Sequence, residues 1–228
     1  MKSKLTLLIL FVAVLSSCKK TTNVDVRLST SGTLTVKLID DAGKGLPNVK
    51  VSLFDDQKDN YNNLNRILLD AQSTDSNGQV DFGDLNPDNY LIVADSVKVN
   101  KVNYNIQEYV QVIVGNAKHK EVKVTDYSGT FSMTITPYIT DKPLKNVGVI
   151  LVPLDWFSFY ASTATQLKHS EFSGVIDQNG FIKFKIPSDK SYGVYVYNTI
   201  TNSSYNYGNN VSVPKDVTVN LEMTIYQP

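Results

Sequence analysis

Short runs of alternating apolar and polar residues dominate the chain. Thr33–Asp40, Asn48–Asp55 and Asp216–Ile225 place apolar side chains at every second position. This period of two is typical of a β-strand with one buried face. No stretch keeps the period of a long helix, although Tyr61–Ala71 could hold a turn of helix between two strands. The pattern therefore predicts an all-β protein.

The strand pattern occurs twice along the chain. Ser31-Gly32-Thr33 opens the first copy, and Ser128-Gly129-Thr130 opens the second. Within the copies, Asp75–Phe82 (DSNGQVDF) matches Asp177–Phe184 (DQNGFIKF). Each Asn-Gly step is expected to supply the positive-φ residues of a tight hairpin. The repeat predicts two tandem domains that abut without a long linker.

The first copy resembles the carboxypeptidase regulatory-like, or transthyretin-like, β-sandwich family. The resemblance rests on GKGLPNVKVSLFD (43–55) and on STDSNGQVDFGDLNPDNYLIV (73–93), with Pro87-Asp88-Asn89 where the family usually has Pro-Gly. It implies two tandem Ig/transthyretin-like antiparallel sandwiches, over residues 31–126 and 127–228. The second copy enters mainly through the internal repeat. Because this sandwich hosts many roles, the resemblance implies a fold and not a function.

The N-terminus predicts secretion and lipidation. Lys2 and Lys4 precede the apolar run Leu5–Leu15, which is too short to span a bilayer comfortably but suits a secretion signal. The following Leu15-Ser16-Ser17-Cys18 resembles the lipobox of bacterial lipoproteins. We therefore expect a signal peptide over 1–17, lipid on Cys18 and a polar tether over 18–30. Several acyl chains give firm membrane anchoring.

The residues after Cys18 bear on location. Lys19 stands where an Asp would resemble an inner-membrane retention signal, so the outer membrane is favoured. Lys19–Thr22 lacks the acidic cluster associated with surface export in lipoproteins of Bacteroidota. The choice between the periplasmic and the cell-surface side therefore stays open. Cys18 is the only cysteine, so no internal disulfide can form.

Composition and spacing narrow the chemistry. Lys+Arg and Asp+Glu both number 22, which gives no electrostatic reason to expect nucleic acid. His119 and His169 lack partners at metal-ligand spacing and are expected on the surface. Asp55–Asn60 gathers several oxygen ligands, but a solvated loop is favoured and calcium is a minor alternative. Lys37 lacks a partner set for an isopeptide bond of the kind found in some Gram-positive pilin domains. We expect no cofactor, no metal and no catalytic site.

An aromatic segment is the candidate contact surface. Leu154–Tyr160 holds the only tryptophan. Its rings would form a platform for sugars or a protein partner, together with a second aromatic group. The residues of this predicted platform are Trp156, Phe157, Tyr160, Tyr205 and Tyr207. The other interpretation, which the usual burial of large aromatic side chains favours, is that the rings complete the core or cover the domain junction.

A short tripeptide suggests a modification. Asp95-Ser96-Val97 resembles the O-glycosylation signal of Bacteroidota, which makes Ser96 a candidate acceptor.

These observations predict a non-enzymatic lipoprotein of the cell envelope, acting as a binding or scaffold module at the outer membrane. Its partners would be the membrane, through the lipid, and a glycan or protein. The alternative is a fimbrillin-like assembly subunit that lends the strand Asp216–Ile225 to a neighbour. Fimbrillins of Bacteroidota are also lipoproteins with two such domains, although this chain is short for one. A hydrolase accessory module comes third.

Overall fold

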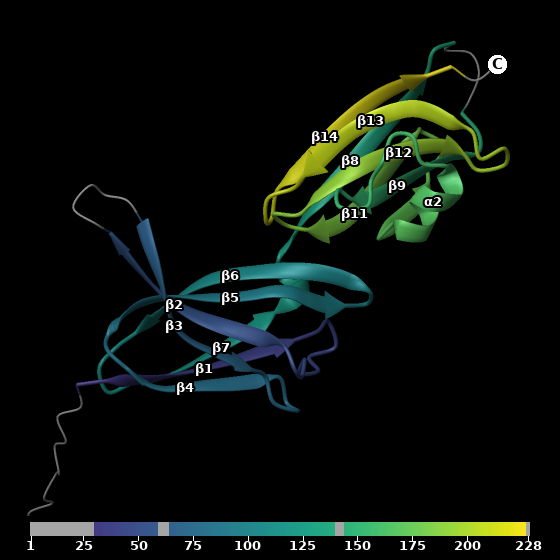
Figure 1. The fold of residues 1–228 in the computed structure, drawn as a ribbon. Helices are drawn as coiled ribbons and strands as arrows, with labels where there is room; N and C mark the ends of the chain where they lie inside the picture. The colour runs from purple at the N-terminus through teal and green to yellow at the C-terminus, as the bar shows by residue number, and fades with distance from the viewer. Residues whose placement is uncertain (1–29, 59–63, 140–143, 227–228) are drawn as a thin grey trace, which may run out of the picture.

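The computed structural model describes residues 30–58, 64–139 and 144–226, and it consists mainly of β-strands (Figure 1). The predicted signal peptide, Cys18 and nearly all of the tether lie outside the described residues. The strands of the first half are β1 (Gly32–Ile39), β2 (Lys50–Lys58), β3 (Leu64–Ser73), β4 (Gln79–Leu85), β5 (Asp88–Val99), β6 (Val102–Val112) and β7 (Ala117–Lys123). Those of the second half are β8 (Ser128–Pro137), β9 (Val147–Pro153), β10 (Phe172–Val175), β11 (Phe181–Pro187), β12 (Ser191–Asn198), β13 (Ser204–Ser212) and β14 (Thr218–Ile225). The predicted all-β class is confirmed.

The two halves repeat one topology. In the first, the sheets have the orders β4-β1-β7 and β3-β2-β5-β6. In the second they are β11-β8-β14 and β10-β9-β12-β13, which is the same order strand for strand. Among the described residues, strands pair only within 32–123 and within 128–225. The short 3-10 helix η1 (Val124–Asp126) lies between the two sets, where the sequence repeat predicts a boundary.

The first and last strands of each sandwich run parallel. β1 pairs with β7 from Thr33↔Ala117 to Ile39↔Lys123. β14 pairs with β8 in the same sense from Thr218↔Thr130. A wholly antiparallel sandwich was expected, so this is a difference. The reason is the connection from β6 to β7 and from β13 to β14, which crosses to the other sheet and brings the last strand in beside the first.

The Asn-Gly turns are not hairpins. The strands that flank Asn77-Gly78, β3 and β4, belong to different sheets, so the turn is a crossover. Only the glycine is left-handed, with φ of 79° at Gly78. Asp75 Oδ1 accepts hydrogen bonds from the backbone N–H groups of Asn77 and Gln79, both at 2.8 Å. The bonds from Gln79 and Asn77 hold the pKa of Asp75 below its ordinary value. The same crossover recurs at Gly180, where φ is 76°.

Each sandwich has its own apolar core. Leu34, Leu38 and Ile92 are fully buried in the first, and Phe131 in the second. Burial of such a side chain stabilises a fold by about 1.5–3 kcal/mol. Phe172 packs, partly buried, against both clusters. The two sandwiches are therefore in contact.

Two local predictions were wrong. β2 extends through Lys58, so Asp55 and Asp56 lie in a strand and not in a solvated loop. The region expected to hold a turn of helix forms β3 from Leu64 onward. Within the described residues the α-helix is α2 (Thr163–His169), which is too short to show a helical period in the sequence. Among the described residues, no group of three metal-ligating side chains is present.

Candidate functional site

Residues 154–170, which make up nearly all of the connection between β9 and β10, form a segment that we name the aromatic insertion. It contains α2 and packs on the face of the sheet β10-β9-β12-β13 that is turned away from the main core (Figure 1). Ile150 and Tyr195 pair across this face, and Tyr195 pairs in turn with Gly208. Ile150, Tyr195 and Tyr197 are at most 9% exposed and form a small cluster with Phe157 packed against it. The insertion therefore has an apolar surface to rest on.

Two glycines let the phenylalanine rings lie directly on the strands. A Cβ at Gly193 would stand 2.1 Å from the ring of Phe157, and one at Gly208 would stand 1.7 Å from the ring of Phe159. The two rings meet edge to face, with their centroids 4.9 Å apart. Because any larger residue at these glycines would displace a ring, the strand sequence and the insertion are matched to each other.

Polar contacts fix α2 above the same sheet. The Thr163 hydroxyl lies 3.0 Å from the Tyr195 hydroxyl and donates to the Asn202 carbonyl oxygen at 2.6 Å. Gln166, 1% exposed, donates through Nε2 to the carbonyl oxygen of Ser158. Such buried bonds are costly to leave unmade, so they hold the insertion in one conformation.

Above these anchors the insertion presents aromatic rings to solvent. Trp156 is 62% exposed, Phe159 59% and Tyr160 99%. Trp156 stacks on His169, with ring centroids 4.7 Å apart and planes at 6°. One face of the indole is thus supported by imidazole. The structure places the predicted residues Trp156 and Tyr160 on the surface, whereas Phe157 anchors them from below.

The rest of the predicted platform lies elsewhere. Tyr205 packs, half-buried, against the main core of the second sandwich, whereas the insertion covers the opposite face of that sheet. Asn198 Nδ2 donates to the Tyr205 hydroxyl at 3.3 Å. The side chain of Tyr207 is outside the described part. The structure therefore does not bring Tyr205 to Trp156.

Two further ring-bearing residues of the aromatic insertion, Phe159 and His169, were not among the residues named for the predicted platform. Phe159 was within reach, because it belongs to the same aromatic run as Trp156. The stacking of His169 on Trp156 depends on α2, a helix of seven residues that is too short to produce a helical period in the sequence.

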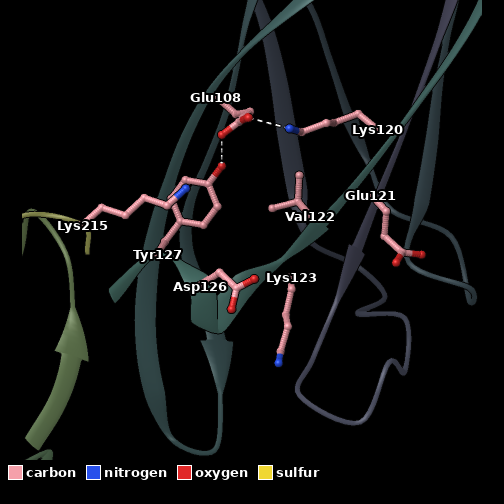
Figure 2. A pocket seen from close by; sticks show the side chains of 8 residues that line it. All are labelled: Glu108, Lys120, Glu121, Val122, Lys123, Asp126, Tyr127 and Lys215. Carbon is pink, nitrogen blue, oxygen red and sulfur yellow. Dashed lines mark hydrogen bonds and ion pairs between the residues drawn. The ribbon is translucent and has the colours of Figure 1, made fainter. Parts of the chain in front are cut away.

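A polar cluster occupies the junction of the two sandwiches (Figure 2). This junction cluster consists of Glu108 from β6, Lys120 from β7, Tyr127 after η1 and Lys215 from the second sandwich. Lys120 Nζ lies 2.5 Å from Glu108 Oε1, and the Tyr127 hydroxyl donates to Glu108 Oε2. Lys215 Nζ stands 4.1 Å from the centroid of the Tyr127 ring. The hollow beside these side chains measures about 130 Å³.

The pKa values of Glu108 and Tyr127 in the junction cluster are both shifted away from the neutral range. Burial works against the negative charge of Glu108, but the hydrogen bonds from Lys120 and Tyr127 outweigh it and the pKa lies below its ordinary value. Burial, followed by the bond to Glu108, raises the pKa of the Tyr127 phenol. A general acid or base works best with a pKa near the operating pH, and neither group has one. The cluster is therefore a satisfied ion-pair network.

A second network, also built from a glutamate, a lysine and a tyrosine, lies in the other sandwich. Lys190 Nζ contacts the two carboxylate oxygens of Glu171 at 2.6 and 2.8 Å, and the Tyr192 hydroxyl donates to Glu171 at 2.7 Å. Burial and the Glu171 bond raise the pKa of Tyr192, which is fully buried. Buried ion-pair networks with shifted pKa values occur in purely structural roles as well as in catalytic sites.

The remaining sequence candidates are surface features. Ser96 is exposed at a bulge of β5, with φ of 55°, beside a hollow lined by residues 46–50 and 95–98. His119 is exposed on β7, and His169 ends α2. Lys37 pairs with Glu121 at 3.1 Å, at the surface. Glycosylation of Ser96 stays a prediction.

Comparison with known proteins gives similarity in structure alone. No protein-family model matches the chain, and no curated protein matches it in sequence. The minor pilin GBS52 of Streptococcus agalactiae is 15% identical, with 87% of this chain and 97% of the pilin covered and a TM-score of 0.40. The shaft pilin SpaA of Lactobacillus rhamnosus GG is 8% identical, with 87% and 98% covered and a TM-score of 0.32.

The TIE protein of Bacillus anthracis is 14% identical, with 86% of this chain covered and a TM-score of 0.38. The chain spans only 34% of that protein's length. All three TM-scores lie below 0.5, so these similarities decide neither the fold nor the function of this chain. In the part that the structure describes, no helix is long and apolar enough to cross a membrane.

Proposed function

We propose that the protein is a non-enzymatic module of the cell envelope, anchored at the outer membrane through lipid on Cys18, that works by binding a glycan or protein partner. The observation that carries the proposal is the aromatic insertion. It is fixed from below by Phe157 and α2, yet it exposes Trp156, Phe159 and Tyr160. Rigid aromatic side chains lose little entropy on contact and dominate many binding surfaces.

The binding test uses the single tryptophan as its reporter. Dextran, xylan and mannan serve as soluble glycan probes, with Trp156 fluorescence and affinity electrophoresis as readouts. For a protein partner, a photo-reactive residue at the exposed position 155, present in the wild-type background and in each variant, reports crosslinks in living cells. The double variant Trp156→Ala/Tyr160→Ala is expected to lose binding or crosslinking. The control Tyr138→Ala removes an exposed ring (73%) that lies outside the insertion, and it should retain binding and crosslinking.

Stability measurements separate contact from folding. Phe157→Ala removes a half-buried anchor and should destabilise the fold by about 2–3 kcal/mol. Trp156→Ala breaks one stacked pair at the surface and should cost about 0.5–1 kcal/mol. Urea unfolding measures both. Equal binding by the double variant and by Tyr138→Ala would place the contact surface elsewhere and refute the proposal.

An assembly subunit is the second candidate, and β3 favours it. This strand pairs with β2 alone at the edge of its sheet, and it exposes Leu64 (52%), Ile67 (43%), Leu68 (54%) and Leu69 (47%). A long apolar edge strand is a ready acceptor for a strand of another chain. In this structure the strand Asp216–Ile225, expected as the lent element, is paired with β8 of its own sandwich.

Two measurements test the assembly role. Sedimentation would show self-association that Leu64→Lys/Leu68→Lys abolishes, because charge on an edge opposes strand addition. Hydrogen exchange reports whether β14 leaves its own sheet. A monomer with β14 fully protected would rule out assembly and leave the binding role intact.

A further inference from the structure

The first sandwich sits between the two ends that the proposed function would pull apart. The predicted anchor at Cys18 precedes β1, and the aromatic insertion lies beyond Tyr127. Any tension between the membrane and a bound partner therefore enters at Gly32 and leaves after Lys123. Figure 1 shows β1 and β7 crossing the first sandwich side by side, with β7 ending toward the second sandwich.

The pairing of β1 with β7 determines how that tension acts. The strands are parallel and in register from Thr33↔Ala117 to Ile39↔Lys123, so entry and exit lie at opposite ends of the pair. Pulling these ends apart slides one strand along the other. Because the hydrogen bonds of a ladder run across the strands, sliding stretches all of them at once. Separation from one end would instead break them one after another.

Side chains reinforce the pair at its middle and at its exit. Lys37 on β1 pairs with Glu121 on β7 at 3.1 Å. Where the chain leaves β7, Asp41 contacts Lys123 at 3.4 Å and accepts a hydrogen bond from the Thr125 hydroxyl at 2.5 Å. These contacts tie the end of β1 to the segment that follows β7, which is where the tension would be applied.

The connection continues into the second sandwich. The Tyr127 hydroxyl is bonded to Glu108 in the first sandwich, and its carbonyl oxygen accepts from the backbone N–H of Ser188 in the second at 2.8 Å. Lys215 lies against the same ring. Tension therefore reaches the second sandwich through Tyr127, which is hydrogen-bonded to both sandwiches.

We propose that β1 and β7 form a mechanical clamp, which lets the first sandwich resist force applied between the membrane anchor and the contact surface. The source of the force rests on the proposed function. The resistance itself is a property of the sandwich and holds whether or not a partner has been found.

Single-molecule pulling on the full chain tests the clamp in two directions. With Cys18→Ser the chain has no cysteine, so engineered pairs give unique handles. The pair Thr30→Cys/Asp126→Cys slides β7 along β1. The pair Thr30→Cys/Asn116→Cys keeps the same handle on β1 but attaches to the other end of β7, and so peels the strands apart. All three positions are exposed.

The sliding pair is expected to unfold at a higher force, and more slowly at any given force, because forced unfolding follows the unfolding rate. Equal forces for the two pairs, or a higher force for peeling, would overturn the clamp. Urea unfolding of both variants should match, which excludes a difference in stability as the cause. Failure of the proposed function appears separately, as unchanged binding by Trp156→Ala/Tyr160→Ala.

Discussion

Neighbouring residues in this chain have opposite roles because of what lies beneath them. Phe157 rests on Gly193 and on the cluster of Ile150, whereas Trp156 is mostly exposed and stacks on His169. Both were predicted as contact residues because they belong to one aromatic segment, Leu154–Tyr160. Sequence shows that an aromatic group is present, but it does not show which ring faces the sheet, because that depends on the strand the ring meets.

Glu108 gives a prediction at this scale. Its pKa in the folded protein lies below the ordinary 4.5, so its charge stabilises the fold above that pH and the contribution is lost as pH falls through the lowered value. Glu108→Gln should therefore reduce the free energy of unfolding by about 1–3 kcal/mol near neutral pH. The deficit should shrink in acid, and urea unfolding across the pH range measures it.

The matched control is Glu121→Gln. Glu121 forms an exposed ion pair with Lys37, its side chain being 57% exposed, and such pairs contribute about 0–1 kcal/mol. A deficit of Glu108→Gln that did not change with pH would show that its charge plays no part in stability.

At the scale of elements, the turns lie where the sequence predicted them, but each connects strands of two different sheets and not the two strands of a hairpin. Asn-Gly normally predicts a hairpin, and here it crosses from one sheet to the other. Local sequence determines that Gly78 adopts positive φ and that Asp75 binds the turn. Which strands then pair depends on residues far apart in the chain, such as Leu34 and Ile92, which belong to one core.

Gly78→Ala tests the turn. A Cβ there would meet the Leu38 carbonyl oxygen at 2.4 Å and the Leu46 nitrogen at 2.6 Å, in addition to the strain of φ at 79°. At Gly43, φ is 77° but nothing lies within 4 Å of the added atom. Gly43→Ala should cost about 1 kcal/mol from strain. Gly78→Ala should cost clearly more in thermal or urea unfolding, and equal losses would show that close packing at this turn is unimportant.

The whole molecule joins two copies of one sandwich through a short, closely packed junction. Phe172 contacts both cores, and Tyr127 connects Glu108 with the loop of Lys215. Because the junction is bonded from both sides, we expect the sandwiches to unfold together.

Calorimetry of two variants at one position tests this coupling. Tyr127→Phe removes only the bond to Glu108, whereas Tyr127→Ala also removes the ring under Lys215. The wild type should unfold in one transition, Tyr127→Phe in one transition at lower temperature, and Tyr127→Ala in two. A single transition for Tyr127→Ala would mean that the coupling passes through other contacts, and two transitions in the wild type would show that the halves are independent.

The sequence by itself determined the all-β class, the repeat, the main strands and the turn glycines, because these follow from local periodicity and backbone preference. Only the tertiary structure decided that β1 and β7 run parallel, that α2 and the aromatic insertion cover one sheet, and that Glu108 meets Tyr127. Each of these joins residues far apart in the chain. Such contacts form because packing two sheets face to face buries the most apolar surface. The resulting free energy depends on the whole sandwich, so no local stretch of sequence determines it.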